Sequence, residues 1–95
     1  MKHTKNKTDS RKGDFAEFYA VTWLWDNGYE VFKNCGCSGP VDLIATKDGK
    51  TTYIDVKTRS GLSGTKRTEE QLKLNVQILN FLPDTRELRF VDHKV

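Results

Sequence analysis

Hydrophobic and polar residues alternate in two segments on either side of a tight-turn signal in the middle of the chain. Residues 41–46 and 51–57 show the two-residue period of half-buried strands, and Asp48 and Gly49 are a typical pair for a two-residue hairpin loop. With that loop, Lys47 pairs with Lys50. The pattern therefore predicts a β-hairpin. One of its faces is apolar and consists of Val41, Leu43, Ala45, Ile54 and Val56.

The opposite face of this hairpin carries two carboxylates. Counting outward from the turn pairs Asp42 with Asp55, and Lys57 points to the same face because it lies two residues beyond Asp55. Like charges directly opposite on a sheet repel each other, so the arrangement needs a compensating cation, which a metal ion can supply. The alternative is an ordinary polar strand pair, and a loop of another length would shift the pairing by one residue.

The segment from Gly13 to Asn27 has the period of a helix. Asp9 or Ser10 is placed to cap its start, and Gly28 is placed to end it. Phe15 falls on its solvent side. Its apolar side comprises Ala20, Val21 and Leu24, flanked by Phe18, Trp23 and Trp25.

Glu17 lies in the middle of that apolar side, although the opposite side, with Thr22 and Asp26, is polar and could have held it. A carboxylate that faces a core costs free energy unless it is paired or binds a metal ion. We therefore expect Glu17 either to join a metal site or to pair with a lysine or cap a neighbouring element.

Turn-rich segments separate the remaining elements. Thr68 and Gln71 show the pattern of a capping box, and the apolar period after them predicts a second helix as far as Phe81, ended by Pro83. The apolar residues of that helix are Leu72, Leu74, Val76, Ile78 and Leu79. Further strands are expected at residues 29–33 and 87–91, with loops at 34–40 and 58–66. The predicted order is helix, strand, strand, strand, helix, strand.

Composition and charge suit a small domain that meets nucleic acid. The 95 residues are enough for one core, no run approaches the roughly 20 apolar residues of a membrane span, and no signal peptide is evident, so we expect a cytoplasmic protein. The net charge is +3, and the first 12 residues hold five basic residues against one acid. We expect residues 1–12 to form a basic arm, for phosphate contacts or as a solvated tail, and residues 13–95 to form one domain.

The two cysteines, Cys35 and Cys37, stand in a loop with no second pair to complete a four-ligand zinc site. We interpret them as reduced loop residues.

The acids and the lysine together resemble the PD-(D/E)XK nuclease superfamily, which includes type II restriction enzymes and archaeal-type Holliday-junction resolvases. Its pattern is an acid on the first helix, an acid at the start of a strand and an (Asp/Glu)-x-Lys triplet on the next strand. Here these positions look like Glu17, Asp42 and residues 55–57, and the resemblance runs from about residue 13 to 71. Val41 stands between Pro40 and Asp42, which departs from the commonest form.

This resemblance implies an α/β fold of the restriction-endonuclease type, with a mixed sheet flanked by helices. It also implies a Mg²⁺ or Mn²⁺ ion bridging Asp42, Asp55 and the scissile phosphate, and hard carboxylate ligands agree with that choice. The backbone carbonyl of Val56 is implied as a further ligand, and Lys57 as the group that orients the attacking water. Glu17 would hold a metal-bound water or a second ion.

Gln71 either assists the site, as a glutamine does in some members of the superfamily, or serves only the capping box. Several basic and hydroxyl side chains are candidates for DNA contacts or for solvated loop and arm positions: Lys5, Lys7, Arg11, Lys12, Arg59, Ser60, Ser63, Lys66 and Arg67.

The function expected from these features is metal-dependent cleavage of DNA by an endonuclease, in a junction-resolving, nicking, homing-like or restriction-like mode. The alternatives are a catalytically silent nucleic-acid-binding module on the same fold, a nuclease that acts on RNA, and an unrelated interaction domain. One active site cuts one strand, so we expect a symmetric homodimer. Its interface is expected at Phe15, Trp23 and Trp25, which cannot all face one core.

Overall fold

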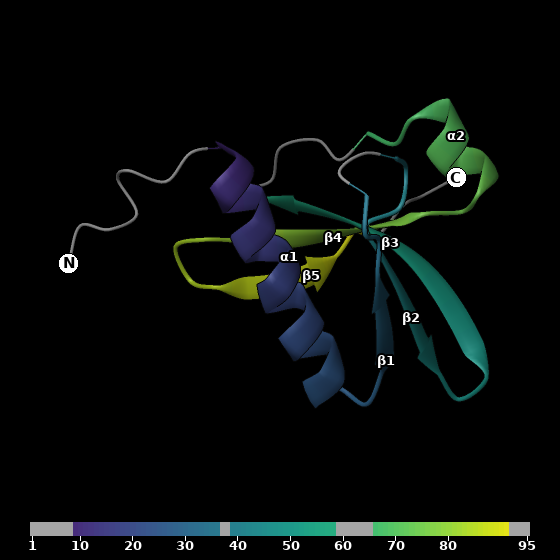
Figure 1. The fold of residues 1–95 in the computed structure, drawn as a ribbon, viewed down its shortest axis with the longest axis horizontal. Coiled ribbons are helices and arrows are strands. Elements are labelled where there is room, and N and C mark those ends of the chain that lie inside the picture. The colour runs from purple at the N-terminus through teal and green to yellow at the C-terminus, as the bar shows by residue number, and fades with distance from the viewer. Residues whose placement is uncertain (1–8, 37–38, 59–65, 92–95) are drawn as a thin grey trace.

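The computed structural model describes residues 9–36, 39–58 and 66–91. Two helices and five strands follow one another in these segments (Figure 1). They are α1 (Asp9–Asp26), β1 (Glu30–Lys33), β2 (Leu43–Lys47), β3 (Lys50–Thr58), α2 (Glu69–Lys73), β4 (Gln77–Leu82) and β5 (Glu87–Phe90).

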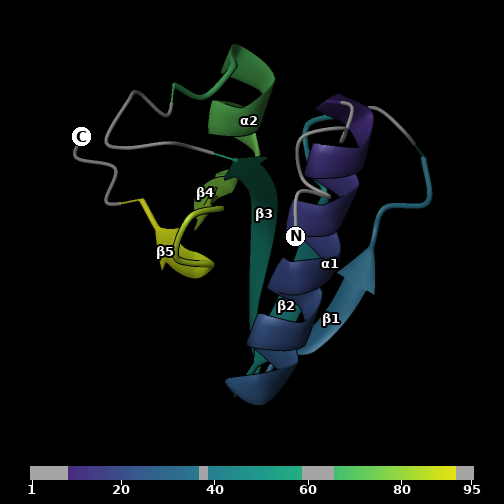
Figure 2. The same ribbon diagram turned by 90° about the vertical axis from the view of Figure 1, so that its left-hand side faces the viewer.

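The strands form one mixed sheet in the order β1-β2-β3-β4-β5. Neighbouring strands are antiparallel except β3 and β4, which are parallel. The helices α1 and α2 lie on opposite sides of β3 (Figure 2). The predicted α/β class, with a mixed sheet flanked by helices, is therefore confirmed. Among the described residues, no helix has the length and apolar character needed to cross a membrane.

The central hairpin has the predicted turn. Lys47 pairs with Lys50, and both loop residues, Asp48 and Gly49, have positive φ angles of 54° and 78°. Two such angles are those of the tight turn whose twist matches paired strands. The register continues as far as Leu43 opposite Ile54. The apolar face is thereby turned toward α1.

Helix α1 begins at Asp9, so the prediction that Asp9 or Ser10 caps its start is wrong. No proline interrupts residues 9–12, and the helix extends into the segment expected to be an arm. Gly28 ends the helix as predicted. It has φ 88°, and the next N–H, of Tyr29, bonds to the carbonyl oxygen of Leu24.

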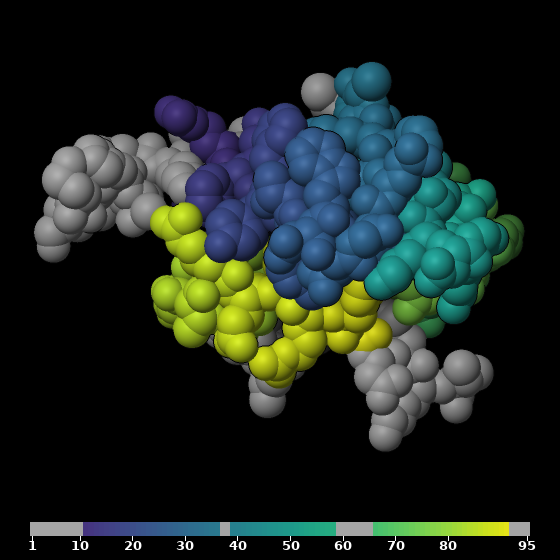
Figure 3. Space-filling view, turned by 90° about the horizontal axis from the view of Figure 1, so that it is seen from below, coloured from purple at the N-terminus to yellow at the C-terminus, as the bar shows by residue number. Residues whose placement is uncertain are grey.

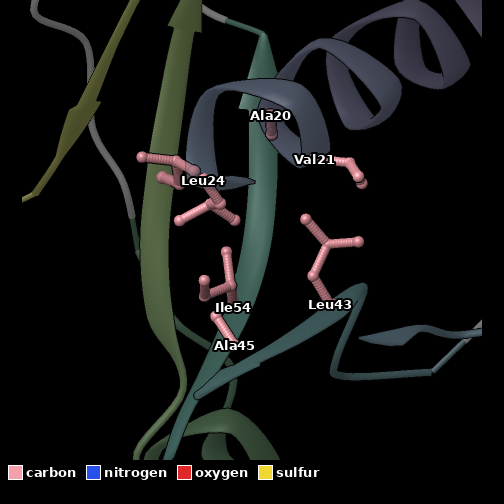
Figure 4. Close-up of a cluster of buried hydrophobic side chains, with 7 residues drawn as sticks. Ala20, Val21, Leu24, Leu43, Ala45 and Ile54 are labelled. Carbon is pink, nitrogen blue, oxygen red and sulfur yellow. The ribbon is translucent and has the colours of Figure 1, made fainter. Parts of the chain in front are cut away.

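The core lies between α1 and the sheet (Figure 4). Seen from below, α1 covers the surface between the hairpin strands and the C-terminal strands (Figure 3). Burial of the apolar side chains that meet here is the main favourable term for folding. The fully or almost fully buried members of this cluster are Ala20, Val21, Leu24, Leu43, Ala45, Ile54 and Leu79.

The second half of the chain differs from the prediction. Helix α2 ends at Lys73, and residues predicted to continue it form β4, parallel to β3. Asn75 has φ 55°, a left-handed conformation that asparagine tolerates and that stops a helix. The order therefore gains one strand. Pro83 lies in the turn between β4 and β5 and ends no helix.

Burial follows the strand and not the predicted helix. Val76, Ile78 and Leu79 are fully buried, whereas Leu72 and Leu74 are 53% and 41% exposed. A short apolar run with β-branched residues fits a buried strand as well as a helix, and pairing with β3 decides between them.

The additional strand also changes which side of α1 is covered. Phe15 packs against Phe81 of β4, and Trp23 packs against Phe90 of β5, with ring centroids 5.8 Å and 6.3 Å apart. Phe15 and Trp23 are therefore partly buried, and their prediction as exposed interface residues is wrong. Trp25 is 59% exposed as expected, and Phe18, predicted to flank the core, is equally exposed.

These positions predict opposite outcomes for two leucines. Leu24→Ala should lower the free energy of unfolding by about 2–5 kcal/mol, because it leaves a cavity under α1. Leu72→Ala on the exposed side of α2 should change it by less than about 0.5 kcal/mol. Urea unfolding of both variants measures this. Equal losses would show that α2 is buried as in the longer predicted helix.

Candidate active site

Asp42 directly precedes β2, and the strand ladder ends beside it. The N–H of Asp42 bonds to the carbonyl oxygen of Ile54 at 2.8 Å, and Ile54 is the ladder partner of Leu43. Asp42 and Leu43 thus both lie opposite Ile54, as at a β-bulge. The predicted direct pairing of Asp42 with Asp55 is wrong in this detail, because the bulge takes up one residue.

The bulge nevertheless directs the Asp42 side chain to the next residues of β3. Its Oδ2 accepts a hydrogen bond of 2.8 Å from the N–H of Val56. This places the Asp42 carboxyl beside that of Asp55, close enough for the two to share a hydrogen bond when one of them is protonated. The predicted neighbourhood of the two acids is therefore present.

Asp55 is buried, with 7% of its surface exposed, and two donors meet its carboxylate. Its Oδ2 accepts a hydrogen bond of 2.8 Å from Nε2 of Gln71 and lies 3.2 Å from Nζ of Lys57. Lys57 is on the same face as Asp55, as strand parity predicted. The Lys57 side chain is 37% exposed, so it remains able to contact a ligand.

Gln71 belongs to the predicted capping box and also contacts Asp55. Its side-chain Oε1 accepts a hydrogen bond from the backbone N–H of Thr68 at 3.0 Å. Its backbone N–H donates to Oγ1 of Thr68, which completes the capping box. Its Nε2 donates to Asp55 and also to the carbonyl oxygen of Pro40 at 3.0 Å. One buried amide thus holds α2, β3 and the turn before β2 together.

The pKa of Asp42 is raised by its surroundings. Burial raises the pKa of Asp42 from 3.8 to about 7, and the hydrogen bond with Asp55 and the charges of Asp55 and Glu17 act in the same direction. The N–H of Val56 acts against this shift. Asp42 therefore needs a cation beside it to be fully ionised at neutral pH.

Glu17 pairs with a lysine, one of the alternatives considered for it. Its Oε1 lies 2.9 Å from Nζ of Lys33, and this hydrogen bond raises the pKa of Lys33, with the charges of Asp14 and Asp42 adding to the effect. Lys33, at the end of β1, was not identified from the sequence. Nothing in a lone lysine at a strand end marks it there, because its role comes from two segments that meet only in the fold.

The acid pair fits a hard divalent cation. The described segments contain no group of three or more His, Cys, Asp and Glu side chains that could hold a metal ion, so Glu17 does not complete a three-acid cluster. Magnesium in phosphate chemistry is commonly held by one or two carboxylates, with phosphate oxygens and waters completing its shell. The carboxylates of Asp42 and Asp55, with the Val56 carbonyl as a further candidate, match that requirement.

A groove of about 280 Å³ lies on β1 and β2 and has Asp42 in its lining. It is lined by Phe32, Lys33, Asn34, Val41, Asp42 and Ile44. A hollow of about 330 Å³ lies at the other end of β3, around Lys50 and Asn75, and contains no acid. Of these two, only the groove beside Asp42 borders a candidate site acid.

Four of the predicted DNA-contact residues lie in the described segments, two in α1 and two just before α2. Arg11 and Lys12 lie exposed in the first part of α1, and Lys66 is exposed before α2. The guanidinium of Arg67 donates to the carbonyl oxygen of Val76 at 3.1 Å, so it holds the start of β4. Lys5, Lys7, Arg59, Ser60, Ser63 and Cys37 lie outside the described residues. Cys35 is exposed and is a free thiol.

Comparison with known proteins bears on this site. Residues 8–85 match the model of a family described as archaeal Holliday junction resolvase (hjc). The chain belongs to this family. The resemblance to the PD-(D/E)XK nuclease superfamily is thereby confirmed.

Two curated proteins similar to this family member are UPF0102 proteins. It is 37% identical over 54 residues to one from Roseiflexus castenholzii and 40% identical over 52 residues to one from Caldicellulosiruptor bescii. The matches cover 55% and 53% of the chain and 44% of each relative, so the chain spans less than half of their length.

The same fold occurs in the solved structure of a bacterial homing endonuclease. The TM-score is 0.66 at 19% identity, over 88% of this chain and 64% of that one. This likeness confirms the restriction-endonuclease-like fold of the family member.

The raised pKa of Asp42 predicts a pH dependence of stability. Because the folded protein retains a proton that the unfolded chain loses near pH 4, the contribution of this group is fully present below pH 4 and is lost as the pH rises through about 7. Asp42→Asn cannot ionise and should be more stable than the wild type at pH 8 by about 1–2 kcal/mol, after allowance for solvent screening.

Urea unfolding in EDTA at pH 5 and pH 8 measures this difference. Asp48→Asn, in the exposed hairpin turn, is the matched control and should leave the pH dependence of the wild type unchanged. A gain for Asp42→Asn that is equal at both pH values would contradict the assignment.

The two roles of Gln71 can be separated by substitution. Thr68→Ala removes only the cap and should cost about 1 kcal/mol. Gln71→Leu should cost more, by about 1–3 kcal/mol, because it also leaves Asp55 and the Pro40 carbonyl without their donor. Thermal or urea unfolding of the two variants compares these losses, and equal losses would leave the capping box as the sole role.

Proposed function

We propose that this protein is a divalent-metal-dependent endonuclease that hydrolyses phosphodiester bonds in DNA. The observation that supports this most directly is the pair of neighbouring carboxyl groups of Asp42, which is half-buried, and Asp55, which is buried, with Nζ of Lys57 3.2 Å from Asp55. Membership in the resolvase family and the fold of a homing endonuclease agree with it.

The residues divide the chemistry among themselves. Asp42, Asp55 and the Val56 carbonyl would hold Mg²⁺ or Mn²⁺, which supplies Lewis-acid stabilisation of charge on the phosphate. The ammonium of Lys57 lies beside the carboxylate of Asp55, so it can orient the attacking water and stabilise negative charge on the phosphate oxygens. Gln71 keeps the Asp55 carboxylate in place, and Glu17 acts at longer range through Lys33, or on a metal-bound water or second ion.

Branched DNA is the substrate class that the family suggests, and nicking, homing-like or restriction-like cutting are further modes. A symmetric homodimer would supply two active sites for a paired cut. Its interface is best placed at Phe18 and Trp25, the exposed aromatic residues seven positions apart on α1. The alternative is a silent DNA-binding module, and the presence of both acids with Lys57 argues against it.

Cleavage tests the proposal. The protein should cut a four-way DNA junction or plasmid DNA with Mg²⁺ or Mn²⁺ and not in EDTA. Asp42→Ala, Asp55→Ala and Lys57→Ala should each lower the cleavage rate at least about 100-fold, the first two by weakening metal binding and the third with metal binding largely retained. Glu17→Gln should have a smaller effect.

Asp48→Ala, which removes an exposed acid from the hairpin turn, serves as the control with wild-type cleavage. A matched RNA substrate separates DNA from RNA as the target. Full metal-dependent cleavage by Asp55→Ala would show that Asp55 holds no metal ion that the reaction needs.

A further inference from the structure

A row of three polar residues crosses the sheet on the face that carries Asp55. Lys57 of β3 is the ladder partner of Asn80 in β4, and Asn80 is the ladder partner of Arg89 in β5. Ladder partners project to the same face of a sheet, and strands lie about 4.8 Å apart, so the row spans about 10 Å from Lys57 to Arg89. We name Lys57, Asn80 and Arg89 the polar row.

The polar row begins in the candidate active site. Lys57 belongs to both, since its ammonium lies 3.2 Å from Asp55. On the other face of β4 and β5, the alternate residues Leu79, Phe81 and Phe90 pack in the core under α1. The row therefore lies on the side of these two strands that faces away from α1, where Ile78 of β4 is fully buried and Arg89 of β5 is exposed.

We propose that the polar row binds the sugar-phosphate backbone of the DNA strand next to the scissile phosphate, with Lys57 and Arg89 as phosphate contacts and Asn80 as the residue that positions them. This inference rests on the proposed nuclease function and adds to it the path of the DNA. The strand leaves the acid pair across β3, β4 and β5.

Arg89 is available for this contact. Its side chain is 62% exposed, and its guanidinium lies 3.9 Å from the carboxylate of Glu87 on the same strand. Such a loose exposed pair contributes little, whereas a guanidinium offers five donors that match phosphate oxygens in pairs. A backbone phosphate is therefore a better partner for Arg89 than Glu87.

Asn80 adds a side-chain acceptor to the row. Its Oδ1 is buried and accepts no hydrogen bond from the described residues, although a buried acceptor without a donor costs about 1–3 kcal/mol. Its two neighbours in the row, Lys57 and Arg89, carry only donors. When a phosphate draws these cations over the row, Oδ1 of Asn80 is the acceptor placed to hold one of them.

DNA binding in EDTA tests the row separately from cleavage. Arg89→Gln should weaken binding of a four-way junction and of a duplex alike, by roughly threefold to tenfold, and reduce the slope of log K against log salt by about 1. Fluorescence anisotropy between 50 and 300 mM KCl measures both. Lys50→Gln makes the same charge change at the opposite end of β3 and should leave the slope near that of the wild type.

Asn80→Leu separates positioning from folding. It removes the unpaired acceptor at similar volume, so the free energy of unfolding should stay equal or rise, while DNA binding weakens. A purely structural asparagine would show the reverse, with lower stability and unchanged binding. That result would contradict the proposed role of the polar row. An equal loss of DNA affinity and of salt slope in Arg89→Gln and Lys50→Gln would contradict it as well.

Cleavage kinetics keep this inference distinct from the nuclease proposal. In Arg89→Gln, KM should rise with kcat close to the wild-type value, because the contact is made equally before and during the reaction. If the wild-type protein binds DNA with the expected salt slope but does not cut it with Mg²⁺ or Mn²⁺, the nuclease proposal is wrong. The proposed DNA contact of the polar row would be unaffected by that result.

Discussion

The carboxylate of Asp55 has to be buried and matched by donors at the same time, and much of the molecule is arranged around it. A buried charge is tolerated only beside hydrogen-bond donors or a cation. The amide of Gln71 and the ammonium of Lys57 meet this need. Because Gln71 also caps α2 and binds the carbonyl of Pro40, the same buried group ties the start of α2 to β3 and to the turn before β2.

Asp42 is not matched in this way, and the difference between the two acids suits metal chemistry. Its carboxyl receives the N–H of Val56 but also faces the charge of Asp55, and its pKa rises to about 7. A divalent cation between the two would relieve both burial and repulsion, with release of the proton from Asp42. In the free protein, ionised Asp42 is therefore unfavourable at the position beside Asp55 where the proposed reaction needs a cation.

The parallel pairing of β3 with β4 has consequences on both faces of the sheet. On one face it widens the apolar surface, so α1 packs through Phe15 and Trp23 as well as through Leu24, and leaves Phe18 and Trp25 exposed. On the other face it places Asn80 beside Lys57. The core, the exposed aromatic surface and the polar row all depend on this one strand pair.

The hairpin, the acidic pair and Lys57 were predictable from the sequence because they depend on short-range rules. These rules are the two-residue turn, the alternation of strand side chains and the capping box, and each acts over fewer than about 16 residues of chain. Counting along the sequence therefore places Lys57 on the same face as Asp55 and Gln71 in the capping box of α2. The start of α1 was misplaced by four residues because helix ends depend on weak local preferences.

Only the tertiary structure decided the rest. Residues 76–82 are compatible with a helix or a buried strand, and the free edge of β3 selects the strand by pairing with it. The ion pair of Glu17 with Lys33, the bulge at Asp42 and the neighbours of Asn80 likewise join residues from separate segments. A local pattern carries no information on such contacts, because they arise when distant segments compete for the same partner groups.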